Sequence, residues 1–345
     1  MLADEPSPIG IALVGCGRIS AAHLRAISEL PEAFRLVATV DRDIDQALAA
    51  AEPFGAAAFA TLEPALALPD VAAVLVCSPN AAHFDQAMMA LCAGRHVLVE
   101  KPMAETGGEA HALAAEAKLR GLILAAGHTF RHGPAVRYLQ DHRAEFGHLR
   151  AIEVSQCVFW DGPQAPWWAQ RTPDEGLILP MFAPHALDFI QLALGDDDPL
   201  RVYAEAARHQ SGWQAEDEVM AVLAYPGRRM ASLHISYNQQ PVHDRKALFF
   251  DAGVLEIIDG ETLLWNGEQR VSPATENLGD PRRMGGRDLS FYFRNQLTEF
   301  AHALRGAPHR CPDGGDAARL ITLLDRIKAS VRANSAEAID PPLKD

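Results

Sequence analysis

The sequence predicts an α/β domain with a doubly wound parallel sheet, followed by an α+β domain whose sheet is largely antiparallel and open-faced. Before residue 127, short unbroken apolar runs alternate with helical patterns, which is typical of parallel strands covered on both faces by crossover helices. After residue 150, the runs alternate with polar residues and are separated by tight-turn signals. We therefore place one domain at residues 1–126 and a second at residues 127–345.

In the first domain, strands are expected where the apolar run is unbroken, and helices where apolar residues recur every three to four positions. The expected strands are Ile9–Val14, Arg35–Val40, Val71–Cys77, His96–Val99 and Leu122–Ala126. The helices expected between them are Ala21–Glu29, Ile44–Phe54, Ala82–Ala93 and Glu109–Arg120. Strand and helix alternate throughout, so the strands are expected to run parallel.

In the second domain, the alternating runs indicate strands with one covered and one open face. These are Ala151–Trp160, Val202–Ala207, Glu218–Tyr225, Arg229–Tyr237 and Ala247–Phe250. Tight turns are expected at Pro226-Gly227, Asp259-Gly260 and Asn266-Gly267. Amphipathic helices are expected at Phe291–Leu304 and Asp316–Ala333, and an exposed mobile loop at Pro281–Asp288. Apolar side chains on an open face need covering, so we expect a homodimer or homotetramer formed through this face.

Composition and charge narrow the class of protein. Lys and Arg total 31 against 45 Asp and Glu, and the net charge of −14 argues against nucleic-acid binding. The longest apolar runs are far shorter than the roughly 20 residues of a membrane span, and the first residues lack the pattern of a secretory signal. The five cysteines are scattered and form no C-x-x-C pair, so neither a disulfide framework nor a zinc site is expected. We expect a cytoplasmic protein with a small-molecule substrate.

The segment Gly15-Cys-Gly-Arg-Ile-Ser20 follows the first strand and opens a helix. Glycines at this place let a pyrophosphate approach the backbone at a helix N-terminus. Asp41 ends the second strand, close to where a ribose-binding acid is expected. A plain strand-to-helix turn, which binds no ligand, would not account for this acid. Asp41 favours NAD, whereas Arg42 could pair with the 2′-phosphate of NADP, stack on adenine or be a surface charge. The prediction is NAD or NADP, with NAD slightly favoured.

Two further segments carry candidate catalytic residues. Glu100-Lys101-Pro102 closes the fourth strand, where a lysine can polarise a substrate oxygen; the simpler interpretation is an ion pair between Glu100 and Lys101. His185 and Asp188 share one face of the apolar segment 182–194, so Asp188 could orient the imidazole, although a lone histidine there is usually a core residue.

Other aromatic and histidine residues are candidates by type. Trp160, Trp167 and Trp168 could line a ring-binding cleft, although they are more often core or interface residues. A metal site is not predicted, because the spacing of the histidines gives no reason to expect them to converge. Those considered were His23, His83, His128 and His132.

Taken together, these segments resemble the Gfo/Idh/MocA oxidoreductases over most of the chain. The segments that carry the resemblance in the first domain are Val14–Ser20 with His23, Leu75–Asn80 with His83, and Ala93–Pro102. Residues 127–131 with 134–136 resemble the domain-crossover segment, and residues 176–188 resemble the active-site helix. Residues 291–306 and 311–330 are similar to the C-terminal helices.

The resemblance implies a Rossmann domain that binds a nicotinamide cofactor, and hydride transfer at a secondary alcohol or ketone of a sugar, cyclitol or related hydroxylated ring. By this resemblance Lys101 would face the reacting oxygen and His185 would shuttle the proton. The implied cofactor-binding residues are Gly15, Gly17, Arg18, Ile19, Asp41, Arg42, Ser78, Pro79, Asn80, His83, Glu100 and Lys101. The implied substrate-binding residues are Lys101, Arg131, Trp168, Met181 and His185.

One position departs from the family pattern. Members commonly carry an aspartate four residues before the active-site histidine, and this chain has Met181 there, between Pro180 and Pro184. The departure puts the substrate in doubt more than the reaction class. Two alternatives stay open: an enzyme that retains NAD without net redox change, as some glycosidases do, and a catalytically impaired, nicotinamide-binding regulatory protein.

Overall fold

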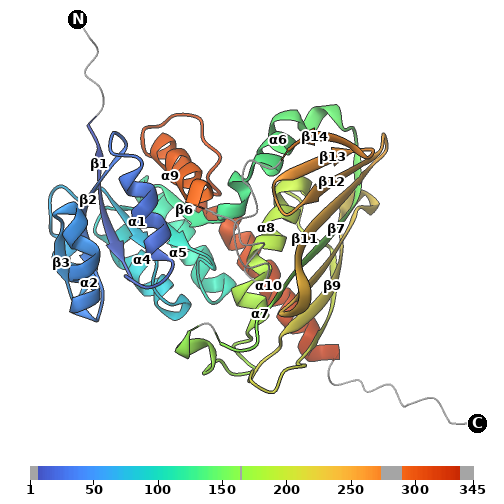
Figure 1. The fold of residues 1–345 in the computed structure, drawn as a ribbon, viewed down its shortest axis with the longest axis horizontal. Helices are drawn as coiled ribbons and strands as arrows, with labels where there is room; N and C mark the ends of the chain where they lie inside the picture. Colours follow the sequence, from blue (N-terminus) through green and yellow to red (C-terminus); the bar gives the residue numbers. More distant parts are fainter. Residues whose placement is uncertain (1–6, 164, 273–289, 335–345) are drawn as a thin grey trace, which may run out of the picture. The chain divides into compact units, whose positions relative to one another are not determined.

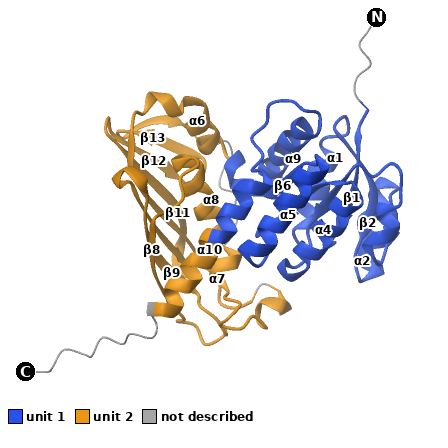
Figure 2. Ribbon diagram, turned by 180° about the vertical axis from the view of Figure 1, so that it is seen from behind, with its two compact units in different colours: residues 1–132, 289–322 blue, residues 133–288, 323–345 orange. Residues whose placement is uncertain are grey.

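The computed structural model describes residues 7–163, 165–272 and 290–334 (Figure 1). The chain divides into two compact units, which are described separately (Figure 2). Unit 1 comprises residues 1–132 and 289–322, and unit 2 comprises residues 133–288 and 323–345. We expected one boundary after residue 126, whereas a C-terminal segment here returns to unit 1. The loop expected at 281–288 lies outside the described residues.

Unit 1 is built on a six-stranded parallel sheet with the order β3-β2-β1-β4-β5-β6. Its strands are β1 (Ile9–Val14), β2 (Phe34–Val40), β3 (Ala57–Phe59), β4 (Ala73–Val76), β5 (His96–Glu100) and β6 (Leu124–Gly127). The strand order reverses between β1 and β4, and ligands of such sheets bind at the carboxyl ends beside this point. The predicted doubly wound parallel sheet is confirmed; β3 was not predicted, because three residues form too short a pattern.

The helices of unit 1 begin and end at recognisable signals. They are α1 (Ser20–Ser28), α2 (Ile44–Ala51), α3 (Leu62–Leu66), α4 (His83–Cys92), α5 (Gly107–Arg120) and α9 (Ser290–Leu304). The Asp43 side chain caps α2, and Thr106 and Glu109 form a capping box at the start of α5. Gly121 ends α5 in the left-handed conformation that glycine adopts readily.

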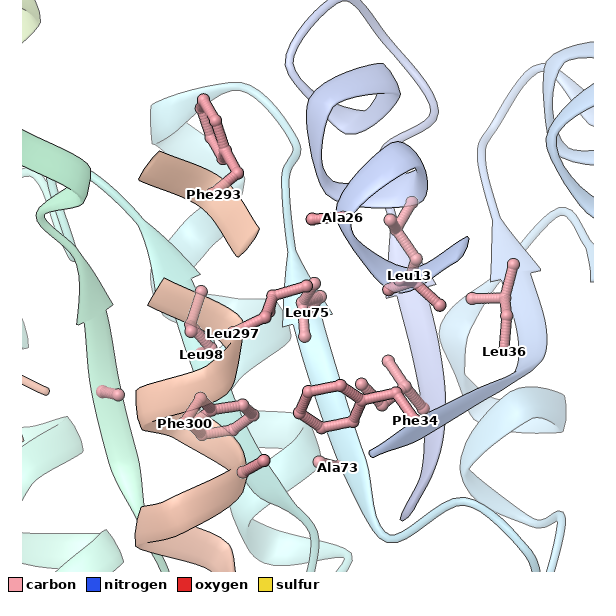
Figure 3. Packing of buried hydrophobic residues seen from close by; sticks show 14 of the residues in the cluster. Leu13, Ala26, Phe34, Leu36, Ala73, Leu75, Leu98, Phe293, Leu297 and Phe300 are labelled. Carbon is pink, nitrogen blue, oxygen red and sulfur yellow. The ribbon is translucent and has the colours of Figure 1, made fainter. Parts of the chain in front are cut away.

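Helix α9 completes the core of unit 1, although it follows β6 by more than 160 residues. Figure 3 shows Leu297 and Phe300 of α9 among strand residues that include Leu75 and Phe34. The rings of Phe34 and Phe300 stack with centroids 6.4 Å apart. Burying a side chain of this size contributes roughly 1.5–3 kcal/mol, so this packing explains why α9 belongs to unit 1.

Unit 2 contains an eight-stranded sheet with the order β14-β13-β12-β11-β7-β10-β9-β8. Its strands are β7 (Leu149–Phe159), β8 (Arg201–Ala207), β9 (Glu218–Ala224), β10 (Met230–Ser236), β11 (Asn238–Phe250), β12 (Val254–Ile258), β13 (Thr262–Trp265) and β14 (Glu268–Val271). Neighbours are antiparallel except β7 and β10, which confirms a largely antiparallel sheet. The tight turns at Asp259-Gly260 and Asn266-Gly267 have positive φ at both residues, the backbone of a type I′ hairpin turn.

One face of this sheet is covered and the other is open. The helices of unit 2 are α6 (Pro134–His142), α7 (Ile178–Met181), α8 (Ala183–Leu194) and the latter part of α10 (Gly314–Asn334). Helix α8 packs against β7 and β10. Apolar side chains remain exposed on the strands, among them Tyr203, Met220 and Val222. Among the helices that the structure describes, none has the length and apolar character needed to cross a membrane.

Candidate functional site

The glycine-rich turn between β1 and α1 requires glycine at its first position. Gly15 has a φ of +86°, and a Cβ atom there would lie 2.5 Å from the backbone nitrogen of Ser78. Gly17 differs, because a Cβ at that exposed position would meet nothing within 4 Å. The Ser20 hydroxyl donates a hydrogen bond to the Gly17 carbonyl at 2.5 Å, at the start of α1. The turn is therefore packed at Gly15 on the loop after β4 and open at Gly17, which fits the close approach of a pyrophosphate.

Asp41 follows β2 and points at this turn. Its Oδ2 accepts a hydrogen bond from the Cys16 amide at 2.8 Å, and its Oδ1 accepts one from the Asp43 amide at 3.0 Å. Each carboxylate oxygen has a further lone pair, so Asp41 can also accept a ribose hydroxyl. The side chain of Arg42 is exposed, as are those of Arg18 and Ile19. The structure thus brings the glycine-rich turn and the second-strand acid together.

The loop after β4 is braced by His83. The Nδ1 of His83 lies 2.7 Å from the Pro102 carbonyl oxygen, and its Nε2 lies 2.8 Å from the Ser78 carbonyl oxygen. Burial lowers the pKa of His83, and the two carbonyl groups oppose that change. Asn80 is buried, Pro79 is exposed, and the Ser78 hydroxyl donates to Gln86 at 2.6 Å. His83 therefore joins the loops that follow β4 and β5, a bracing role that the sequence did not predict.

The end of β5 holds a buried ion pair. The Nε2 of His23 lies 2.8 Å from Oε1 of Glu100, and neither side chain is more than 7% exposed. The Oε2 of Glu100 accepts a hydrogen bond from the Lys101 amide at 3.1 Å. Burial opposes the charge on Glu100, but the hydrogen bond and charge of His23 and the charge of Lys101 hold the pKa of Glu100 below its usual value.

Two more pKa values are shifted at this place. Burial lowers the pKa of Lys101, and the Glu100 charge counteracts burial while the Arg18 charge adds to it. Burial also opposes the charge on His23, but Cys77 and Glu100 together raise the pKa of its imidazole. From the sequence, His23 is a candidate only by residue type, and its place in the segment that resembles the family is the one signal that singles it out.

Arg131 lies in the short 3₁₀ helix η3 (Thr129–His132) of unit 1 and is only 7% exposed. Its Nη1 lies 3.8 Å from Oδ2 of Asp316, which belongs to the same unit. The structure thus places this guanidinium beside a carboxylate, and the substrate contact implied by the family stays a prediction.

In unit 2, His185 lies in the first turn of α8. Phe182 separates α7 from α8 with a φ of −127°, and Pro184 occupies the first turn, where proline is tolerated. The His185 amide donates to the Phe182 carbonyl at 3.3 Å, and the two rings meet edge to face at 6.2 Å. Met181 and Asp188 are both buried. Because the helix is interrupted at Phe182, Met181 and His185 do not belong to one continuous helical turn.

The segment that leads into α7 is held by two charged side chains, the buried Arg171 and the partly exposed Glu216. The Oε1 of Glu216 accepts hydrogen bonds from the amides of Leu177 at 2.9 Å and Leu179 at 3.2 Å. The guanidinium of Arg171 donates to the carbonyls of Gly176 at 2.6 Å and Glu175 at 3.1 Å. Burial raises the pKa of Glu216. Nothing local in the sequence singles out these two residues, because the groups that they hold are distant in the chain or are backbone amides and carbonyls.

Trp168 belongs to an aromatic cluster within unit 2. Its ring stacks on Tyr237 at 6.4 Å with a 9° angle between the planes, and it meets Trp160 at 5.1 Å. Trp168 is buried, whereas Trp160 and Trp167 are partly exposed. Trp168 is therefore surrounded as a core residue is, which is the alternative that the sequence left open. A contact between Trp168 and a substrate stays a prediction.

Each set of predicted residues is thus assembled inside its own unit. The cofactor candidates, Lys101 and Arg131 belong to unit 1, while Trp168, Met181 and His185 belong to unit 2. Within the described ranges, no group of three or more His, Cys, Asp or Glu side chains is arranged to hold a metal ion.

Two segments of the chain match known families. Residues 9–128 match the family described as "Oxidoreductase family, NAD-binding Rossmann fold". Residues 142–256 match the family described as "GFO/IDH/MocA C-terminal domain". The two matches follow one another in the order that the resemblance implied, the first in unit 1 and the second in unit 2.

Individual proteins that are similar to this chain share between 23% and 35% of its residues over the matched segments. A 4-carboxy-2-hydroxymuconate-6-semialdehyde dehydrogenase of Sphingobium sp. is 35% identical over 132 residues, which are 38% of this chain and 42% of that protein. A 1,5-anhydro-D-fructose reductase of Ensifer adhaerens is 28% identical over 281 residues, covering 78% of this chain and 80% of that one. The WlbA dehydrogenase of Bordetella pertussis, solved with NADH and UDP-GlcNAcA, has a TM-score of 0.78 at 23% identity, covering 95% and 97% of the two chains. This last likeness concerns the fold.

Proposed function

The chain belongs to the Gfo/Idh/MocA oxidoreductases, and we propose that it is a nicotinamide-dependent dehydrogenase or reductase acting on a secondary alcohol or ketone of a sugar-related ring. The observation that carries the proposal is Lys101, a lysine of lowered pKa at the end of β5, the third strand along the sheet from Asp41 at the end of β2. The reductase of Ensifer supports a sugar-related substrate.

The residues present fit a dinucleotide. The backbone at Gly17 has open space beside it, and Gly15 packs on Ser78. Between these two glycines, the Cys16 amide donates a hydrogen bond to Asp41. We assign the pyrophosphate to this turn and the adenosine ribose to Asp41. A carboxylate at that place repels a 2′-phosphate, so NAD is the expected cofactor, while the exposed Arg42 is the residue through which NADP could be accepted. When bound, the nicotinamide supplies the hydride chemistry.

The protein supplies proton transfer and charge stabilisation. In the oxidative direction, the Lys101 ammonium stabilises negative charge as it develops on the substrate oxygen. A lowered pKa suits this role, because the lysine can then both release a proton and bind one at a pH closer to neutral. His185, in the first turn of α8, is assigned the proton of the substrate hydroxyl.

Met181 affects which hydrogen bonds the site can offer to the hydroxyl groups of a substrate. A methionine offers no strong hydrogen bond where family members commonly carry an aspartate, so the ring bound here relies on other groups for its hydroxyl contacts. This same substitution is the observation that keeps a non-catalytic, nicotinamide-binding role as a second candidate.

The experiment is a thermal-shift titration with NAD⁺, NADH, NADP⁺ and NADPH, followed by turnover assays on sugars, cyclitols and cyclic diols. A ligand at 100 times its Kd adds about 2.7 kcal/mol to stability, which raises Tm by several degrees. We expect a shift with NAD⁺ or NADH and turnover of at least one ring substrate. Binding without turnover would favour the regulatory role, and tightly retained dinucleotide without net redox change would favour the glycosidase-like role. No shift and no retained dinucleotide would contradict the proposal.

We also propose that the open face of the unit 2 sheet is covered by a second copy of the chain. Met220 is 60% exposed and Val222 is 52% exposed on this face, which has a groove of about 800 Å³. The groove combines apolar side chains with charges of both signs, including Arg245 and Glu256. A self-association that buries these side chains removes apolar surface from water.

A further inference from the structure

We propose that His23 is a positioning residue for Lys101: it holds the Glu100 carboxylate in place and neutralises its charge, so that Glu100 does not bind the lysine as a permanent counter-ion. This inference rests on the proposed function only where it gives Lys101 a role in proton transfer. The arrangement itself is a property of unit 1 and can be tested without any substrate.

Four elements enclose the pair. His23 comes from α1 and Glu100 from β5, and their 2.8 Å contact is buried. Gly127 of β6 lies against the carboxylate, since a Cβ there would stand 3.2 Å from Oε1 of Glu100. Phe293 of α9 meets the imidazole edge to face at 5.0 Å. A carboxylate enclosed in this way needs a protein partner for its charge, because water is largely excluded.

The second oxygen of Glu100 is turned toward the lysine. Its Oε2 accepts the hydrogen bond of the Lys101 amide at 3.1 Å, so the same side chain contacts His23 through one oxygen and the backbone of Lys101 through the other. Any change in the orientation of the carboxylate would therefore move the start of the segment that carries Lys101. His23 is the residue that fixes this orientation from the far side.

The charges around Lys101 explain why neutralisation matters. Glu100 favours the ammonium form, whereas burial and the positive charge of Arg18 disfavour it. A protonated His23 makes its pair with Glu100 neutral, and this reduces the attraction that Glu100 exerts on the lysine. Burial lowers the pKa of His23, but Cys77 and Glu100 raise it by more, which favours the charged form of the ring.

One more titratable group faces the carboxylate. His83, on α4, experiences the Glu100 charge as well, but burial lowers the pKa of His83 and its ring nitrogens lie beside backbone carbonyls. His83 is therefore neutral near pH 7 and cannot replace the charge of His23. Removal of His23 would leave Lys101 as the nearest cation for a buried carboxylate and would hold the lysine in its ammonium form.

The test measures the titration of Lys101 itself in the full chain. Trace acetic anhydride modifies only the free amine, and mass spectrometry of the labelled peptides gives the extent of reaction at each lysine over a range of pH. Lys101 is a partly exposed residue, and the exposed Lys118 on α5 is an internal control. The variants are His23→Gln, Glu100→Gln and the double variant, each checked for folding by thermal unfolding.

We expect the midpoint of Lys101 to rise by at least one pH unit in His23→Gln, which lowers its labelling about tenfold at a pH below the midpoint. Glu100→Gln should lower the midpoint by well under one pH unit, because the pair that Glu100 forms with His23 is already neutral overall. The double variant should return it near the wild-type value, and Lys118 should titrate alike in all four proteins.

An unchanged Lys101 midpoint in folded His23→Gln would overturn the proposal. If that variant does not fold, Glu100→Gln decides, since a fall of a full pH unit or more would show that Glu100 is the counter-ion of Lys101 in spite of His23. Failure of the dehydrogenase proposal is seen separately, as absent turnover, and does not alter the lysine titration. Where turnover is found, the limb of the pH–rate profile assigned to Lys101 should move in His23→Gln by the same amount as the labelling midpoint.

Discussion

The carboxylate of Asp41 accepts a hydrogen bond from the backbone amide of Cys16 at 2.8 Å, and this contact joins the end of β2 to the glycine-rich turn that follows β1. Asp41 thus stabilises the turn and at the same time presents negative charge where an adenosine ribose is expected. Two functions in one side chain can be separated by a substitution that keeps the shape and removes the charge.

For Asp41→Asn we expect a folded protein with weaker NAD⁺ binding. Hydrogen bonds to a charged group are worth about 1.5–3 kcal/mol, so Kd should rise by roughly ten- to a hundredfold. The affinity for NADP⁺ should fall less or rise, because the repulsion of the 2′-phosphate is removed. Isothermal titration calorimetry with both dinucleotides measures this, with Asp45→Asn on the exposed face of α2 as the control. Equal losses for both dinucleotides would contradict the assignment.

Gly15→Ala and Gly17→Ala should separate folding from binding. At Gly15, an added methyl would meet the Ser78 backbone at 2.5 Å in a left-handed conformation, so we expect a loss of stability of about 1–3 kcal/mol. At Gly17 the methyl meets nothing, so stability should change little while dinucleotide affinity falls. Urea denaturation and thermal-shift titration distinguish the two effects. Equal stability of the two variants would show that the close approach at Gly15 is not required.

Lys101→Met should lower kcat by roughly 10²- to 10⁴-fold, because proton transfer and charge stabilisation at the substrate oxygen are both lost. Cofactor affinity should change far less than kcat, because Lys101 is only one of the twelve residues that the resemblance assigns to the cofactor. Steady-state kinetics on whichever ring substrate the panel identifies, together with a dinucleotide titration, measure the two effects. The control is Lys118→Met on the exposed side of α5. Wild-type turnover in Lys101→Met would remove Lys101 from the mechanism.

The His23–Glu100 pair should stabilise the fold within a defined range of pH. The pKa of Glu100 is lowered from 4.5, so its contribution is complete above that value and is lost as the pH falls through the folded-state pKa. The pKa of His23 is raised from 6.5 to about 10, so its contribution is complete below 6.5 and is lost as the pH rises toward 10. The full effect is therefore present between about pH 4.5 and 6.5.

In that range, His23→Gln should lose about 3–5 kcal/mol of unfolding free energy, the cost of leaving a buried charge without its partner. The difference between wild type and variant should shrink as the pH rises toward 10. Urea denaturation at several pH values measures it. A difference that is the same at every pH would show that the pair acts only through packing.

The proposed self-association can be tested on the open sheet face. Val222→Glu places a charge among exposed apolar side chains of β9, and we expect a shift toward the monomer in size-exclusion chromatography with light scattering. Leu119→Glu is the matched control, because Leu119 is an equally apolar, 80% exposed residue of unit 1 on α5. A wild-type monomer, or an oligomer unaffected by Val222→Glu, would contradict the proposal.

The elements that sequence reasoning predicted are those whose signals are local. β1 and β5 are unbroken apolar runs, and the turn at Gly15 follows from residues adjacent in the chain. The strand β3 and the helix α6 were missed, since Ala57–Phe59 is three residues long and Pro134–His142 was read only as part of a crossover segment.

By itself, the sequence determined the parallel sheet of unit 1, the glycine-rich turn with its acid, and the Lys101 strand end, because periodicity, turn chemistry and strand order are properties of neighbouring residues. The tertiary structure alone decided that α9 packs into unit 1, that Glu216 holds the start of α7, and that His23 pairs with Glu100 across 77 positions. Such contacts depend on which buried surfaces and unpaired charges meet when distant segments pack, and that outcome has no signature in local sequence.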